Sequence, residues 1–131
     1  MSTPVKDHSE GFLALASDAK KRISEISIDD YKRMREAALP HILVDVREES
    51  EWNAAHAQGA IHLSKGVIER DIEKTVPDPS SRLVLYCGGG YRSALAADNL
   101  QKMGYRNVLS LDGGWRAIEA SGLPVERKLV S

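Results

Sequence analysis

The spacing of apolar residues switches repeatedly along the chain between a helical and an extended period. An apolar residue at about every third or fourth position predicts an amphipathic helix, and a continuous apolar run of about four to eight residues predicts a buried strand. The helical segments are residues 11–23, 31–39, 48–57, 66–76, 93–105 and a last one that starts at Trp115. The extended segments are residues 24–28, 41–47, 59–64, 82–87 and 107–114, the last strand of the prediction.

Short polar residues, glycine and proline mark several ends of these helices. Asp29 and Asp30 are expected to cap the N-terminus of the second helix. Gly104 is expected at the C-terminus of the fifth helix, and Gly122 and Pro124 stop the last one. Strands and helices therefore follow one another with short connections.

Strands separated by helices of this length need crossover connections, which are right-handed in nearly all proteins. The near-continuous apolar runs at 41–47 and 82–87 are typical of strands that are buried on both faces. We therefore expect an α/β fold with a mainly parallel sheet covered by helices on both faces.

Length and charge narrow the class of protein. The 131 residues suit a single domain, because domains of about 100–150 residues are the most common. The 18 basic and 19 acidic side chains nearly cancel, so nothing points to a nucleic-acid partner. No apolar run approaches the roughly 20 residues of a membrane span, and residues 1–10 do not resemble a signal peptide. We expect a cytoplasmic protein with no membrane partner.

Cys87 is the only cysteine of the chain. It has no internal partner for a disulfide, and the lack of a second thiol argues against a dithiol oxidoreductase. The four histidines are scattered, and no set of cysteine and histidine has the spacing of a zinc site. We expect no metal ion and no cofactor, so that any chemistry of Cys87 involves an external partner.

The segment LVLYCGGGYRSALAA places Cys87 between a predicted strand and the helix that follows it. Ligand sites of open α/β sheets lie outside the carboxyl ends of the strands, where we expect this cysteine. The glycines at 88–90 allow backbone conformations in which several N–H groups turn toward the sulfur. The start of the helix near Ser93 and the guanidinium of Arg92 add positive potential.

These features favour the thiolate form of Cys87. Comparable settings lower the pKa of a cysteine from about 8.5 to between about 3.5 and 7.5, and the thiolate is the nucleophilic form. We interpret Cys87 as an ionised nucleophile held in an anion-binding loop. The alternative is a small apolar residue at the end of a core strand, which would leave the glycines, the arginine and the helix start without a common explanation.

The loop segment is one of five distinctive segments that occur in order along the chain. They are LVDVREESEW, HAQGAIHLSKG, VLYCGGGYRSALAA, GYRNVLSLDGGWRAI and GLPVE. With them the chain resembles the rhodanese-like superfamily, specifically its single-domain bacterial members, over about residues 24–127. The resemblance implies a three-layer α/β fold with a five-stranded, mainly parallel sheet flanked by helices. It divides the chain into an N-terminal extension with one helix, residues 1–23, and a rhodanese-like domain, residues 24–131.

The resemblance also implies sulfane-sulfur transfer in two steps. Cys87 takes a sulfur atom from thiosulfate or a persulfide donor, holds it as a persulfide, and passes it to a thiol or to cyanide. Arg92 is expected to shape the loop and attract an anionic donor, and Ser93 to add a hydroxyl donor. The residues expected to bind the substrate are Gly88, Gly89, Gly90, Tyr91, Arg92 and Ser93.

Loop length separates two chemistries within this superfamily. Phosphatase-like relatives place five residues between cysteine and arginine, whereas residues 88–91 are the only ones between Cys87 and Arg92. The shorter ring suits a single sulfur atom. Many thiosulfate-using members carry a basic residue directly after the cysteine, where this chain has Gly88. A persulfide donor is therefore at least as suitable as thiosulfate.

Other functions stay open beside a small-molecule sulfurtransferase. The same loop suits a persulfide carrier or sensor that serves one dedicated protein partner. A phosphatase-like hydrolase is disfavoured by the loop length, and a purely structural domain is disfavoured because Cys87 is present.

Asp45 and Arg47 end another predicted strand, and we expect them to brace the site as an ion pair or hydrogen-bonded pair rather than to contact substrate. The ring of Tyr91 is a candidate wall of the pocket. A structural or surface role is expected for the remaining distinctive side chains, which are Trp52, His56, His62, Lys65, Arg70 and Trp115.

Overall fold

The computed structural model describes residues 8–128 and has an α/β fold. Its central sheet has five strands in the order β1-β6-β5-β2-β4, and every neighbouring pair is parallel. The strands are β1 (Ser24–Ile26), β2 (Ile42–Asp45), β4 (Ile61–His62), β5 (Leu83–Tyr86) and β6 (Val108–Leu111). The expected five-stranded parallel sheet is confirmed.

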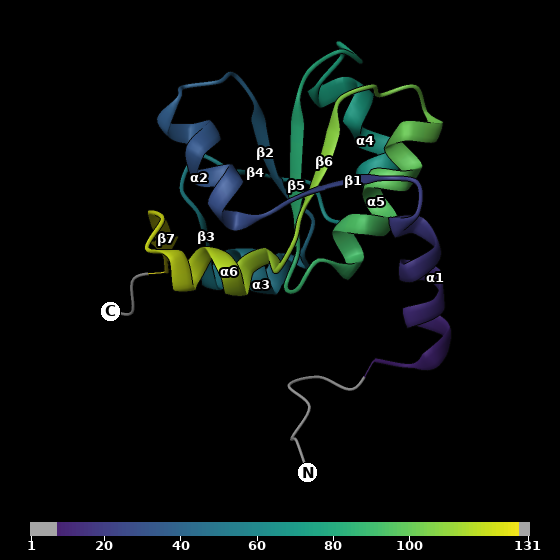
Figure 1. Cartoon of the computed structure of the whole chain (residues 1–131), viewed down its shortest axis with the longest axis horizontal. Helices are drawn as coiled ribbons and strands as arrows, with labels where there is room; N and C mark the ends of the chain where they lie inside the picture. Colours follow the sequence, from purple (N-terminus) through teal and green to yellow (C-terminus); the bar gives the residue numbers. More distant parts are fainter. Residues whose placement is uncertain (1–7, 129–131) are drawn as a thin grey trace.

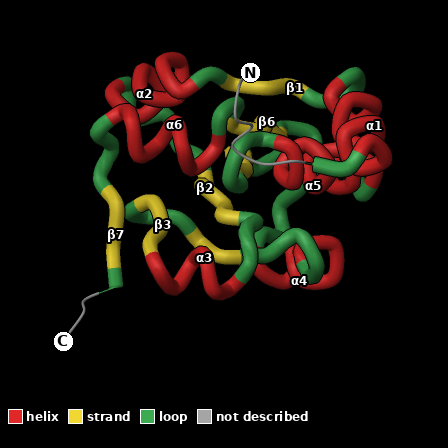
Figure 2. The backbone as a smooth tube through the Cα atoms, turned by 90° about the horizontal axis from the view of Figure 1, so that it is seen from below, coloured by secondary structure: helices red, strands yellow, loops and turns green. Residues whose placement is uncertain are grey.

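Helices cover both faces of this sheet (Figures 1 and 2). The helices are α1 (Glu10–Lys20), α2 (Ile28–Glu36), α3 (Glu49–Ala54), α4 (Ile68–Thr75), α5 (Tyr91–Lys102) and α6 (Gly114–Ser121). Residues of α4 and α5 belong to one apolar cluster against the sheet, and residues of α2 and α6 to another. The three-layer arrangement is therefore confirmed.

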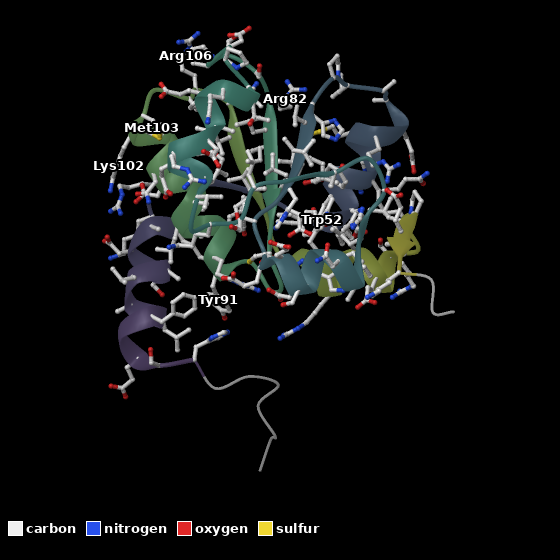
Figure 3. The ribbon with its side chains drawn as sticks, turned by 180° about the vertical axis from the view of Figure 1, so that it is seen from behind. Trp52, Arg82, Tyr91, Lys102, Met103 and Arg106 are labelled. Atoms are coloured by element: carbon white, nitrogen blue, oxygen red, sulfur yellow. The ribbon has the colours of Figure 1, made fainter. Side chains whose placement is uncertain are left out.

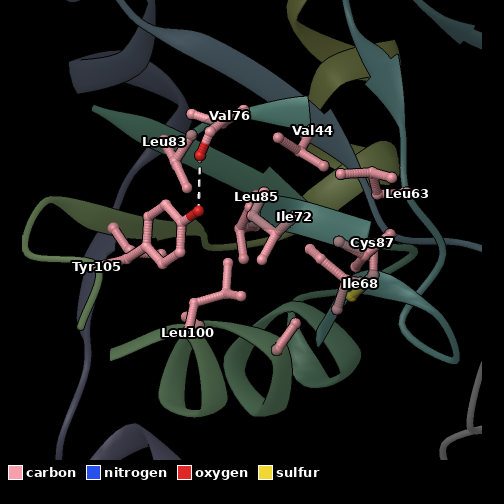
Figure 4. Packing of buried hydrophobic residues seen from close by; sticks show 14 residues of the cluster. Val44, Leu63, Ile68, Ile72, Val76, Leu83, Leu85, Cys87, Leu100 and Tyr105 are labelled. Carbon is pink, nitrogen blue, oxygen red and sulfur yellow. Dashed lines mark hydrogen bonds between the residues drawn. The ribbon is translucent and has the colours of Figure 1, made fainter. Parts of the chain in front are cut away.

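Side chains of β5 alternate between these two clusters, as consecutive residues of a strand must. Leu83 and Leu85 belong to the cluster under α4 and α5, and Val84 and Tyr86 belong to the one under α2 and α6. Cys87 continues the alternation on the α4 and α5 side, where it lies near Ile68 (Figure 4). The cysteine is thus backed by the hydrophobic core.

A second, two-stranded antiparallel sheet is absent from the sequence prediction. It pairs β3 (Ala55–Ala57) with β7 (Val125–Arg127). The predicted helix over 48–57 is therefore wrong beyond Ala54, and the strand at 107–114 is not the last one. These short strands depend on distant partners, since the Ala57 N–H donates to the Tyr86 hydroxyl at 3.0 Å.

Two helix starts also differ from the prediction. Ser27 rather than Asp29 or Asp30 caps α2, because its hydroxyl accepts the Asp30 N–H at 3.1 Å. The two aspartates lie in the first helical turn, where negative charge is favourable. Helix α5 begins at Tyr91 instead of Ser93.

The predicted C-terminal signals differ in outcome. Gly122 is the C-cap of α6 with a φ of 80°, as expected. In α5 the C-cap is Met103, and Gly104 follows it with a φ of 106°. Glycine is favoured at such positive φ angles because it has no Cβ.

Helix α1 packs on the outer side of α5 (Figure 2). Ala16 and Ala19 are fully buried at this contact, and Arg22 just after α1 pairs with Asp98 of α5 at 2.7 Å. The division into residues 1–23 and 24–131 stays a prediction, and its outermost residues, 1–7 and 129–131, lie outside the described ones. No helix within residues 8–128 has the length and apolar character of a membrane span.

Candidate active site

Cys87 lies directly after β5, at the carboxyl edge of the parallel sheet, and only 1% of its surface is exposed. Its sulfur accepts the backbone N–H of Gly90 at 3.1 Å. Gly90 has a φ of 106° and caps the N-terminus of α5. The three glycines thus turn the chain from strand to helix within one short loop around the sulfur, as the sequence suggested.

Two buried hydroxyl groups continue from the sulfur into the protein. The Ser93 Oγ lies 3.5 Å from the Cys87 Sγ, and the Ser110 Oγ of β6 lies 2.8 Å from the Ser93 Oγ. A thiolate has no hydrogen to donate, so the Ser93 hydroxyl must donate to it and the Ser110 hydroxyl then donates to Ser93. Donors aligned in this way polarise one another.

The pKa of the Cys87 thiol reflects two opposing effects. Burial is the largest single influence and raises the pKa of Cys87, because a buried charge is poorly solvated. The Ser93 hydroxyl and the backbone N–H groups of Ser93, Gly90 and Gly89 act together in the other direction. Their sum lowers the pKa below the ordinary value and favours the thiolate.

Backbone N–H groups at the start of α6 bind the backbone of the active-site loop. The Trp115 N–H donates to the Cys87 carbonyl at 2.6 Å, and the Arg116 N–H donates to the Gly88 carbonyl at 3.3 Å. Gly114 makes this approach possible, since a Cβ there would lie 2.3 Å from the Cys87 carbonyl oxygen. With its carbonyls bonded to α6, the loop turns N–H groups toward the sulfur.

Arg92 is held by a residue that sequence reasoning did not single out, Glu51 of α3. Their side chains form two hydrogen bonds, of 2.8 and 3.1 Å. The bond from Arg92 is the main reason that the pKa of Glu51 falls to about 2. Glu51 also accepts the Glu48 N–H at 3.0 Å, which fixes it at the start of α3. The charge of Arg92 is therefore largely balanced before any donor arrives.

Asp45 and Arg47 form a buried ion pair of 2.8 Å, as expected for a bracing role. The Arg47 guanidinium also donates to the Ala55 carbonyl at 2.6 Å and lies 4.6 Å from the centre of the Trp115 ring. The pair thus joins β2 to β3 and to α6. Neither side chain lines the pocket over Cys87.

The side chains of the remaining residues considered in the sequence do not reach the pocket over Cys87. Trp52 stacks on His56 at 3.5 Å and on His62 at 5.0 Å between ring centres, and Figure 3 shows it far from Tyr91. Arg70 pairs with the neighbouring Asp71 on the surface of α4. None of the six distinctive side chains lines the pocket over Cys87.

A small pocket of about 40 Å³ opens over Cys87, and a cavity of about 10–15 Å³ holds one water molecule. Four of the six residues expected to bind the substrate, Gly88, Gly89, Tyr91 and Arg92, line it, whereas Gly90 and Ser93 do not. Three further residues complete the lining, and they are His8, Phe12 and Arg116. Sequence reasoning missed all three, because they come from segments far from Cys87 and carry no local signal.

No group of histidine, cysteine, aspartate or glutamate within residues 8–128 is arranged to hold a metal ion. What the site does offer is a buried sulfur, several N–H donors and a short path to solvent. This arrangement can stabilise a negatively charged sulfur atom one bond beyond the Cys87 Sγ.

A family model for the rhodanese-like domain matches residues 27–121. The protein named "Putative sulfur carrier protein YrkF" of Bacillus subtilis is 28% identical over 101 residues, which are 77% of this chain and 54% of that protein. The chain thus spans about half the length of this relative. Thiosulfate sulfurtransferase GlpE of Vibrio cholerae is 32% identical over 101 residues, which are 77% of this chain and 92% of that enzyme.

A solved structure supports the same fold. A Rhodopseudomonas palustris protein of unknown function, named a possible tyrosine phosphatase, superposes with a TM-score of 0.78 at 28% sequence identity. The match covers 95% of this chain and all of the other, 100%. The match is therefore longer than the segment 27–121 that the family model covers.

Proposed function

Because this chain belongs to the rhodanese-like family, we propose that it is a sulfurtransferase in which Cys87 carries the sulfane sulfur as a persulfide. The observation that carries the proposal is the set of donors on a single buried sulfur, from Gly90 at 3.1 Å and Ser93 at 3.5 Å. Such donors stabilise an anionic sulfur and need no additional base.

In the first step the Cys87 thiolate attacks the outer sulfur of the donor. A bond forms between the Cys87 Sγ and that sulfur, and the S–S bond of the donor breaks with its electron pair on the leaving group. Thiosulfate releases sulfite, and an organic persulfide releases a thiolate. In the second step an acceptor thiolate or cyanide attacks the outer sulfur of the Cys87 persulfide, and the Cys87 thiolate is regenerated.

The loop residues have distinct parts in this scheme. The N–H groups of Gly89, Gly90 and Ser93 bind the sulfur anion, and the Ser93 hydroxyl adds a donor. Arg92 sets the shape of the loop through Glu51 rather than binding the donor by itself. The relative named thiosulfate sulfurtransferase supports sulfur transfer as the reaction. Thiosulfate or a persulfide as donor, a thiol or cyanide as acceptor, and a cytoplasmic location are further parts of the proposal.

Intact-mass spectrometry tests the proposal. The protein is incubated with thiosulfate or with glutathione persulfide, excess donor is removed, and the mass is measured before and after addition of cyanide. We expect a gain of one sulfur atom that cyanide removes, and no gain on Cys87→Ser. An unchanged mass with both donors, or an equal gain on the serine variant, would sink the proposal.

A carrier role is the second candidate, because one relative bears the name of a sulfur carrier. A carrier loads quickly but releases sulfur slowly to cyanide and small thiols, and rapidly to one partner protein. Comparing the rates of loading and of release separates the two roles. Rapid release to small acceptors selects the enzyme.

Phosphate-ester hydrolysis is the third candidate, since the structural relative is named a possible tyrosine phosphatase. With residues 88–91 alone between Cys87 and Arg92, and with the start of α6 bonded to the loop, we expect no hydrolysis of p-nitrophenyl phosphate. Hydrolysis that disappears in Cys87→Ser would revive this function.

A further inference from the structure

We propose that α1 and Arg116 complete a donor site that selects organic anions carrying a sulfane sulfur, such as thiosulfonates and carboxylated persulfides, over inorganic thiosulfate. The inference rests on the proposed sulfur transfer and names the substrate class of the same site. It assigns the carbon group of the donor to an aromatic wall, and the sulfonyl oxygens of a thiosulfonate or the carboxylate of a persulfide to Arg116.

The aromatic wall stands on one side of the pocket. The ring centre of Tyr91 lies 5.0 Å from that of His8 and 6.2 Å from that of Phe12. Figure 3 shows Tyr91 directed from the start of α5 toward α1. His8 and Phe12 also line the pocket over Cys87. The wall is therefore built from Phe12 of α1, from His8 two residues before that helix, and from Tyr91 at the start of α5.

This wall is fixed in place by the packing of α1. Ala16 and Ala19 are buried against α5, and their small side chains let the two helices approach closely. The Lys20 ammonium lies 4.9 Å from the centre of the Tyr91 ring. The ion pair of 2.7 Å between Arg22 and Asp98 holds the far end of the contact. The donor thus meets a preformed surface.

The charge of the pocket is positive and comes mainly from Arg116. No carboxylate among residues 8–128 lines the pocket, and Arg92 is paired with Glu51 at 2.8 Å. The Arg116 guanidinium is exposed and has no ion pair among residues 8–128. Its Nη1 lies 4.0 Å from the position of a Cβ on Gly89. The sulfonyl oxygens of a thiosulfonate, or the carboxylate of a persulfide, would therefore bind at Arg116.

The aromatic wall and Arg116 together favour one class of ligand. Faces of aromatic rings bind carbon groups well but offer no hydrogen-bond donor to a small, strongly hydrated anion such as thiosulfate. A donor with a carbon group next to its anionic group contacts the wall and Arg116 at once. A thiosulfonate reacts with balanced atoms and charges, because the Cys87 thiolate takes its outer sulfur and the sulfinate leaves with the electron pair of the broken S–S bond.

Three donors test the aromatic wall, namely thiosulfate, methanethiosulfonate and benzenethiosulfonate. The second-order rate constant of persulfide formation on Cys87 is measured by mass spectrometry for each donor. It is divided by the rate constant for the reaction of the same donor with a small thiolate in solution, which corrects for the intrinsic reactivity of the donor. We expect benzenethiosulfonate to be preferred over methanethiosulfonate about tenfold, as burial of a ring face implies. Phe12→Ala should reduce this preference to below about threefold.

Arg116→Gln tests the charge, with Arg70→Gln on the surface of α4 as the matched control. The donors are 2-carboxyethyl persulfide and 2-hydroxyethyl persulfide, which differ in one negative charge. In Arg116→Gln we expect KM for the carboxylated donor to rise about tenfold with kcat unchanged. We expect little change for the hydroxylated donor, or for either donor in Arg70→Gln.

The outcomes separate this inference from the proposed function. Normal loading of Cys87 with donor preferences that Phe12→Ala and Arg116→Gln leave unchanged would overturn the donor site while sulfur transfer stands. Failure of the wild-type protein to load with any donor would overturn both. Because Phe12→Ala removes a contact of α1, Phe12→Leu is measured as well, and its thermal unfolding must match the wild type while the preference for the aromatic donor falls.

Discussion

Cys87 is buried among apolar side chains, yet the pKa of its thiol is lowered, because donors from Ser93, Gly90 and Gly89 outweigh the cost of burial. The contribution of Ser93 depends on the direction of its hydroxyl. Ser110 determines that direction, since the two oxygens lie 2.8 Å apart in the core. A residue of β6 thus acts on the sulfur through another side chain.

Ser110→Ala should therefore raise the pKa of Cys87. The variant loses a hydrogen bond of about 1 kcal/mol that supports the thiolate through Ser93, so the neutral thiol is favoured. The measurement is the pH dependence of alkylation of Cys87 by iodoacetamide. Ser121→Ala, which removes a hydroxyl bonded to the Ile118 carbonyl at the end of α6, should leave the midpoint unchanged. An unchanged midpoint in Ser110→Ala would show that the hydroxyl chain has no effect on the thiolate.

Glu51 carries a second prediction, on stability. The folded-state pKa of about 2 lies below the ordinary value of 4.5, so the bond to Arg92 stabilises the fold above pH 4.5 and is lost as the pH falls toward 2. The free energy of unfolding in urea, wild type minus Glu51→Gln, should be positive at neutral pH and decrease steadily below pH 4.5. Glu49→Gln, on the exposed face of the same helix, is the control. A difference that is independent of pH would contradict the role of the pair.

Among the elements, α6 has the closest contact with the loop. Its first N–H groups have no acceptor within the helix and instead donate to the carbonyls of Cys87 and Gly88. Gly114 permits this contact and has a φ of 49°. The close contact with the Cys87 carbonyl and the positive φ both require glycine at position 114.

Gly114→Ala should therefore be far more damaging than Gly122→Ala. Both residues have positive φ, which costs an alanine about 1–2 kcal/mol. A Cβ at Gly122 meets no atom within 4 Å, whereas one at Gly114 lies 2.3 Å from the Cys87 carbonyl oxygen. We expect Gly122→Ala to cost about 1–2 kcal/mol with normal persulfide loading, and Gly114→Ala to cost about 3 kcal/mol or more with loading lost. If both variants lost the same free energy of unfolding in urea, the loop would be able to move and accommodate a Cβ at position 114.

The elements also show where sequence patterns end. The central strands β2 and β5 and the helices α4 and α5 follow from apolar spacing, because each buries apolar side chains in the core. Strands β3 and β7 are three residues each; β3 continues a segment predicted as a helix, and β7 follows the last predicted helix. Their existence depends on pairing with each other, on the bond that Arg47 donates to the Ala55 carbonyl, and on the bond that the Ala57 N–H donates to the Tyr86 hydroxyl.

On the scale of the whole molecule, α1 is an additional layer outside α5 that also forms part of the pocket wall. All five strands of the main sheet lie within residues 24–131. A chain of residues 24–131 should therefore fold, but with the face of α5 that contacts Ala16 and Ala19 exposed to water. Its melting temperature, measured by circular dichroism, should fall by on the order of 5 °C or more. An unchanged melting temperature would show that α1 is a peripheral attachment.

The sequence by itself determined the α/β class, the parallel sheet and the loop of residues 87–93, because the signals that predict them lie in short stretches of the chain. Apolar spacing, glycine and a helix start are local signals, and the loop is one contiguous segment. The tertiary structure alone decided that Glu51 balances Arg92, that Ser110 directs Ser93, and that Gly114 lets α6 bind the loop. It also brought His8, Phe12 and Arg116 to the pocket. Contacts of this kind join segments far apart in sequence, and only the packing of complete layers brings them within bonding distance.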